Sequence, residues 1–76
     1  MDIKILGTGC PKCKQLEANA KEAVEKLANG ATVEKVGELA KIMEYGVMMT
    51  PALVVDGVVK SSGKVLTAAE IMEILK

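Results

Sequence analysis

The sequence predicts an α/β fold in which a mixed four-stranded sheet is flanked by three helices, in the order β-α-β-α-β-β-α. Short runs of β-branched residues alternate with apolar patterns of helical period, which is typical of α/β proteins. Asp56-Gly57 separates two valine-containing runs, the strongest short-range signal of a β-hairpin. Half of the 76 residues are hydrophobic and the formal net charge is zero, which argues against disorder. We therefore expect residues 1–76 to form a single domain.

The first strand and helix follow from the apolar residues of the first third of the chain. Ile3 and Ile5 lie on one face of a strand over residues 2–6. Pro11 suits the first turn of a helix, where its missing N–H is not needed. Asn29-Gly30 ends that helix with residues that tolerate a left-handed backbone. The apolar residues at helical spacing are Cys13, Leu16, Ala20, Ala23, Val24 and Leu27.

Residues 31–36 predict a short edge strand, because Val33 and Val36 do not alternate. A helix joins this strand to the first one, so the two are expected to be parallel with a right-handed crossover. A short helix is expected over residues 39–45, and Gly46 ends it. Its apolar stripe consists of Leu39, Ile42 and Met43.

The second half of the chain predicts a hairpin and a capped helix. Residues 51–55 and 58–60 are the expected hairpin strands, and a loop is expected over residues 61–65. Thr67 with Glu70 three residues later makes a capping box at the start of the last helix. Leu66 and Ile71 can form the hydrophobic staple, and the buried stripe is Ile71, Ile74 and Leu75.

Composition excludes several function classes. Balanced charge and a single aromatic residue, Tyr45, provide neither a basic field nor a stacking platform for nucleic acid. No run approaches the roughly 18 apolar residues of a membrane-spanning helix. The first residues lack the apolar segment of a signal peptide. We expect a cytoplasmic monomer that binds neither nucleic acid nor membrane.

Two cysteines, Cys10 and Cys13, carry the chemistry of the chain. The motif Cys10-Pro11-Lys12-Cys13 follows a predicted strand, and Cys-x-x-Cys in such a setting is a redox motif. The start of a helix favours the thiolate of Cys10, because free N–H groups and the positive end of the helix dipole point there. Cys13 falls on the apolar stripe, so we expect it to be buried and to keep its proton longer. The spacing thus pairs an attacking Cys10 with a resolving Cys13.

The motif Gly7-Thr8-Gly9-Cys10-Pro11-Lys12-Cys13 after a strand, with Thr50-Pro51 opening a later strand, resembles the thioredoxin/glutaredoxin superfamily. It is most similar to the small redox-active disulfide proteins of archaea and bacteria, over essentially the whole chain. The resemblance implies a thioredoxin-like fold and a dithiol–disulfide oxidoreductase that reduces protein disulfides without a cofactor or metal. Cys10 is then the nucleophile and Cys13 the resolving residue.

The resemblance also implies a cis Thr50–Pro51 bond beside the cysteine pair. Substrate contacts are expected from Thr50, Pro51, Pro11 and Lys12, and the implied partners are disulfide-containing proteins and an upstream disulfide reductase. Thioredoxins carry a buried carboxylate on the strand before the motif. Here Lys4 stands at that place, and we expect it to be an exposed strand lysine.

A Cu(I) carrier is the alternative function. Two thiolates suit Cu(I), and the thioethers of Met48 and Met49 are soft ligands as well. With two Cys and no His, the chain alone lacks the four ligands of a structural zinc site. Metal carriers of this size follow the order βαββαβ, whereas this chain is predicted to end on a helix. A third interpretation makes both cysteines small packing residues.

Overall fold

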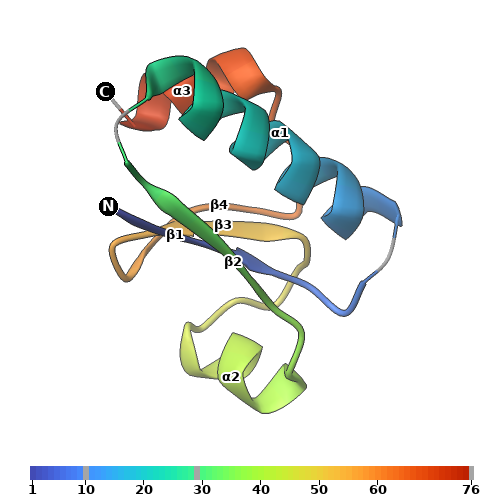
Figure 1. Ribbon diagram of the computed structural model, residues 1–76. Coiled ribbons are helices and arrows are strands. Elements are labelled where there is room, and N and C mark those ends of the chain that lie inside the picture. Colours follow the sequence, from blue (N-terminus) through green and yellow to red (C-terminus); the bar gives the residue numbers. More distant parts are fainter. Residues whose placement is uncertain (10, 29, 76) are drawn as a thin grey trace.

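The computed structural model describes residues 1–9, 11–28 and 30–75. The elements occur in the predicted order β-α-β-α-β-β-α, so this expectation is confirmed (Figure 1). Their bounds are β1 Asp2–Leu6, α1 Pro11–Leu27, β2 Thr32–Val36, α2 Leu39–Glu44, β3 Ala52–Val55, β4 Val58–Ser62 and α3 Ala68–Leu75.

The four strands form one mixed sheet in the order β2-β1-β3-β4. β1 and β2 are parallel, and Leu6 is the register partner of Val36, so the predicted edge strand lies where it was expected. β3 runs antiparallel to β1, with Leu6 opposite Ala52. The carboxyl ends of β1 and β2 and the amino end of β3 therefore meet at one end of the sheet, and the β1–α1 loop starts there.

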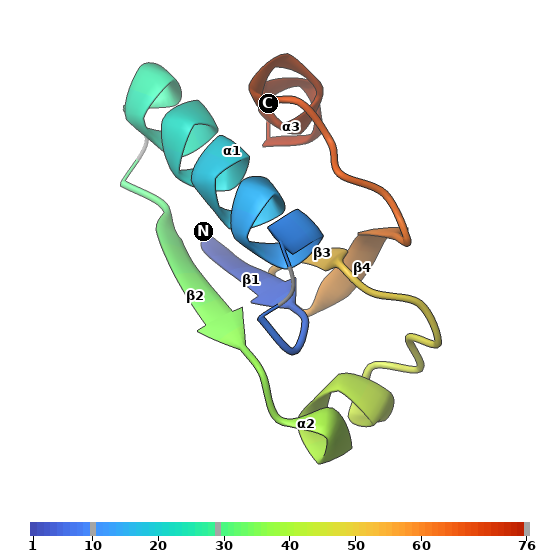
Figure 2. The ribbon, with the colours of Figure 1, turned by 90° about the vertical axis from the view of Figure 1, so that its right-hand side faces the viewer.

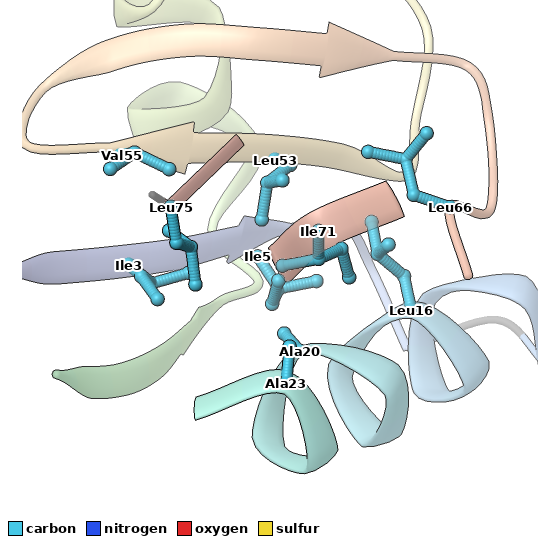
Figure 3. Packing of buried hydrophobic residues seen from close by; sticks show 10 residues of the cluster. All are labelled: Ile3, Ile5, Leu16, Ala20, Ala23, Leu53, Val55, Leu66, Ile71 and Leu75. Carbon is cyan, nitrogen blue, oxygen red and sulfur yellow. The ribbon is translucent and has the colours of Figure 1, made fainter. Parts of the chain in front are cut away.

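Helices α1 and α3 cover one face of the sheet, and α2 lies on the other side (Figures 1 and 2). Because side chains alternate along a strand, Ile3 and Ile5 of β1 point toward α1 and α3, while Lys4 and Leu6 point toward α2. Figure 3 shows the sheet and the two helices meeting in the larger core cluster. Its buried members are Ile3, Ile5, Leu16, Ala20, Ala23, Leu53, Val55, Leu66, Ile71 and Leu75.

A smaller cluster fills the face toward α2. It consists of Leu6, Val36, Ile42, Val47, Ala52 and Val54. Ile42 is the buried residue of α2, whereas Leu39 and Met43 are 63% and 65% exposed. The predicted apolar stripe of this helix is therefore buried at Ile42 and exposed at the other two residues. A helix of six residues is so short that only about one side chain packs against the sheet, and its other apolar side chains face outward.

The hairpin and the last helix have the predicted turn and cap. Asp56 and Gly57 both have positive φ, 49° and 83°, as a tight turn between twisted strands requires. The loop was expected to begin at residue 61, and this boundary was wrong, because β4 continues to Ser62. A register shift at Leu53/Val54 accommodates this longer strand.

The capping box is confirmed. The N–H of Glu70 donates to Oγ1 of Thr67 at 3.2 Å, and the N–H of Thr67 donates to Oε1 of Glu70 at 3.0 Å. Each side chain thus satisfies a backbone donor that the first turn of α3 leaves without a helical partner.

Candidate active site

The predicted redox motif lies where β1 passes into α1. β1 is the inner strand between β2 and β3, so its carboxyl end is held from both sides. Pro11 and Lys12 open α1 and are exposed. Cys13 is fully buried on the sheet-facing side of α1, together with Leu16, Ala20 and Ala23. Cys10 lies outside the described residues.

Gly7 packs directly against Cys13. A Cβ at position 7 would overlap Sγ of Cys13 and lie 2.9 Å from its Cβ. The N–H of Gly7 donates to the carbonyl oxygen of Val36 at 3.0 Å, which extends the β1–β2 pairing by one bond. The sequence analysis placed Gly7 only in the motif after the first strand and did not predict this contact. A glycine directly after a strand and six residues before a buried cysteine was the available signal.

Thr50 and Pro51 lie beside this point. Leu6 and Ala52 are partners in the antiparallel β1–β3 register, so the next positions along the two strands are Gly7 and Pro51. The Thr50–Pro51 peptide bond is cis, as the resemblance implied. Pro51 is fully buried, and Thr50 is exposed. The sheet therefore brings Thr50-Pro51 to the same end as the cysteine motif, although about 40 residues separate them in the chain.

The segment before Thr50 presents apolar side chains to the outside. Met48 is 97% exposed and Met49 64% exposed, while Val47 beside them is buried in the smaller cluster. The stem of Met49 lies over Gly63, since a Cβ at Gly63 would be 3.3 Å from the Met49 Cβ. The N–H of Gly63 donates to the carbonyl oxygen of Pro51 at 2.8 Å. The loop is thus fixed to the end of β4.

Lys4 does not occupy an open strand surface, so the expectation of an exposed lysine was wrong. It is half-buried on the α2 face and hydrogen-bonded to Tyr45, the residue that follows α2. This hydrogen bond, together with the charges of Tyr45, Asp2 and Glu34, raises the pKa of Lys4 above its ordinary 10.5. Sequence reasoning found no role for Tyr45, because 41 positions separate it from Lys4.

A cavity of about 370 Å³ adjoins this pair. It is lined by Lys4, Glu34, Val36, Lys41, Glu44 and Tyr45. None of the predicted site residues that the structure describes lines it, so it is separate from the cysteine motif.

In the described ranges, no helix is both long enough and apolar enough to cross a membrane.

Comparison with known proteins agrees with this architecture. A family model described as a thioredoxin domain matches residues 1–76. A protein named thioredoxin from Methanothermobacter thermautotrophicus is 47% identical over 75 residues, which cover 99% of this chain and 97% of the relative. A protein named thioredoxin from Methanocaldococcus jannaschii is 45% identical over 74 residues, which cover 97% of this chain and 85% of the relative.

The mixed sheet, the flanking helices and the full-length relatives together define a thioredoxin-like thiol–disulfide oxidoreductase. The chain belongs to the thioredoxin domain family. The Cu(I) carrier finds no support in these comparisons, and the observed element order ends on α3 rather than on a strand.

Proposed function

We propose that the protein reduces disulfides of other proteins through Cys10 and Cys13. The observation that carries this proposal is the burial of Cys13 in the first turn of α1, directly after the exposed Pro11 and Lys12. A sheltered thiol on the sheet side of the helix suits the second step of disulfide exchange, where outside reagents must not compete. The preceding cysteine then makes the first attack.

The exchange has two steps. The Cys10 thiolate attacks one sulfur of a substrate disulfide; a Cys10–substrate disulfide forms and the other substrate sulfur leaves as a thiolate, which takes up a proton. Cys13, after losing its proton, attacks Cys10 Sγ, so the Cys10–Cys13 disulfide forms and the second substrate thiolate leaves. The substrate gains two electrons and two protons, and the dithiol becomes a disulfide.

The surface around the motif supports a protein substrate rather than a small one. Met48, Met49 and Thr50 are exposed on the segment that leads to Pro51, and Pro51 is next to Gly7 in the extended β1–β3 register. Flexible methionine side chains adapt to apolar surfaces of different shapes. Thr50 then offers backbone groups to an extended substrate segment, and Pro11 and Lys12 contact it from α1.

The catalytic cycle requires an upstream disulfide reductase, because each turnover leaves the Cys10–Cys13 disulfide. The protein acts as a cytoplasmic monomer, in which one chain supplies both thiols and no cofactor takes part.

Trapping of mixed disulfides tests the assignment of the two cysteines. Cys13→Ser is expected to accumulate a covalent complex with insulin chains, because the first attack still occurs and the second does not. Cys10→Ser is expected to trap nothing, and the parent protein should reduce insulin with loss of two hydrogens from its own mass. Trapping by Cys10→Ser instead of Cys13→Ser would reverse the roles, and an inert reduced parent would overturn the proposal.

A further inference from the structure

The contact between Gly7 and Cys13 has a functional meaning that goes beyond the fold. Cys13 Sγ occupies the space that a side chain at position 7 would need. Glycine is thus required here because the β1–α1 loop closely approaches a sulfur atom. Its backbone angles are not the reason, since the φ of Gly7 is not positive.

The Cys13 sulfur is held in place by the packing of α1, and the β1–α1 loop is held by a backbone hydrogen bond. Cys13 is on the buried face of α1 with Leu16 and Ala20, so the helix is packed on the sheet and cannot retreat without loss of core contacts. The loop backbone is fixed by the hydrogen bond from Gly7 to Val36 at 3.0 Å. The backbone of Gly7 is therefore fixed in place, and the Cys13 sulfur packs directly against it.

We propose that Gly7 is a positioning residue for the second step of disulfide exchange. Because Gly7 has no side chain, the Cys13 sulfur can lie in contact with the loop that leads to Cys10. From this position it attacks the mixed disulfide. This inference rests on the proposed roles of Cys10 and Cys13. A methyl group at position 7 displaces the sulfur, and a misplacement of about 1 Å in a reacting atom costs up to about a hundredfold in rate.

Equimolar Ellman's reagent separates the two steps on the reduced protein. Attack by Cys10 releases one nitrothiobenzoate ion and leaves a second bound in a mixed disulfide, and attack by Cys13 releases the second ion. In Gly7→Ala we expect the second release to slow about tenfold to a hundredfold, while the first stays within about twofold. A variant that was merely less stable would not slow the second release while leaving the first release unchanged.

Gly37→Ala is the matched control. It makes the same substitution one residue after β2, where the added Cβ meets the Gly7 oxygen at an ordinary contact distance and does not approach Cys13. Both releases should keep the parent rates. If the parent releases no second ion, the proposed role of Cys13 fails. If the parent releases it and Gly7→Ala releases it as fast or faster, the role of Gly7 fails and the proposed function stands.

A double-mutant cycle keeps the inference testable if Gly7→Ala does not fold. Gly7→Ala is made in the parent and in Cys13→Ala, which lacks the overlapping sulfur, and unfolding in urea is compared. Gly7→Ala should lower the stability less in the Cys13→Ala background, or fold only there. The Cβ at position 13, which lies 2.9 Å from the added methyl group, is present in both backgrounds, so Gly7→Ala keeps part of its cost in Cys13→Ala. An equal loss of stability in both backgrounds means that the sulfur is not what Gly7 accommodates, and overturns the inference.

Discussion

At the scale of single residues, a side chain's surroundings decide its chemistry more than its type does. Lys4 faces the smaller cluster and donates a hydrogen bond to Tyr45, and this contact is the first cause of its raised pKa. Cys13 is buried because α1 places it over the sheet, while Lys12 before it is exposed. Neighbouring positions in one turn thus differ in access to solvent, which is the difference that the two-step exchange needs.

The Lys4–Tyr45 hydrogen bond predicts a pH-dependent contribution to stability. A group whose pKa is raised on folding stabilises the fold below its unfolded pKa, ordinarily 10.5 here, and this contribution is lost as the pH rises through the folded value. Tyr45→Phe should therefore unfold at lower urea than the parent near neutral pH. The difference should shrink above pH 10.5.

The measurement is a series of urea unfolding curves for both proteins from neutral to alkaline pH. Phe keeps the ring packed against the smaller cluster and removes the hydroxyl, so it isolates the hydrogen bond. A difference that stayed constant across the whole series would assign it to packing and contradict the role of the Lys4 charge.

At the scale of elements, the helices differ in how they are held. α1 buries four side chains and carries the ion pairs Glu17–Lys21 and Glu22–Lys26 on its outer side, where each contributes only a few tenths of a kcal/mol. α2 buries Ile42 alone. The start of α3 depends on the capping box at Thr67. Local hydrogen bonding therefore matters most for α3, and core packing matters most for α1.

Thr67→Ala should lower the free energy of unfolding by about 1 kcal/mol, because the N–H of Glu70 loses its acceptor. Chemical unfolding followed by circular dichroism measures this loss. Thr8→Ala, at an exposed loop position outside the helices, is the control and should change stability by less than about 0.5 kcal/mol. Equal effects of the two substitutions would show that the cap does not hold α3.

At the scale of the whole molecule, β1 connects the core to the site. It pairs with both β2 and β3, contributes Ile3 and Ile5 to the larger cluster and ends directly before Gly7, which lies next to Cys13. With 76 residues, the protein has a small core, and a domain of this size has few kcal/mol of stability to lose. Stability and site geometry consequently depend on the same strand.

Ile5→Ala should cost about 2–5 kcal/mol, because a fully buried side chain between the sheet and the two helices is removed. Met48→Ala, at a residue 97% exposed, should change stability by less than about 0.5 kcal/mol. Thermal unfolding of the two variants beside the parent measures both effects. A stable Ile5→Ala would show that the larger cluster is not the source of the fold's stability.

The sequence by itself determined the element order, the hairpin turn, the capping box and the placement of Cys13 on a buried helical face. All of these depend on hydropathy period or on hydrogen bonds between residues a few positions apart, so the local chain contains the information. The resemblance added the family and the cis Thr50–Pro51 bond, which spacing alone does not indicate.

Only the tertiary structure decided the contacts across the sheet. The overlap of Gly7 with the space of Cys13, the hydrogen bond from Lys4 to Tyr45 and the outward position of Leu39 each depend on which surfaces meet after folding. The register shift at Leu53/Val54 belongs here too, since it depends on the partner strand. Periodicity predicts that a face is buried, but distances between side chains far apart in the chain are set by packing.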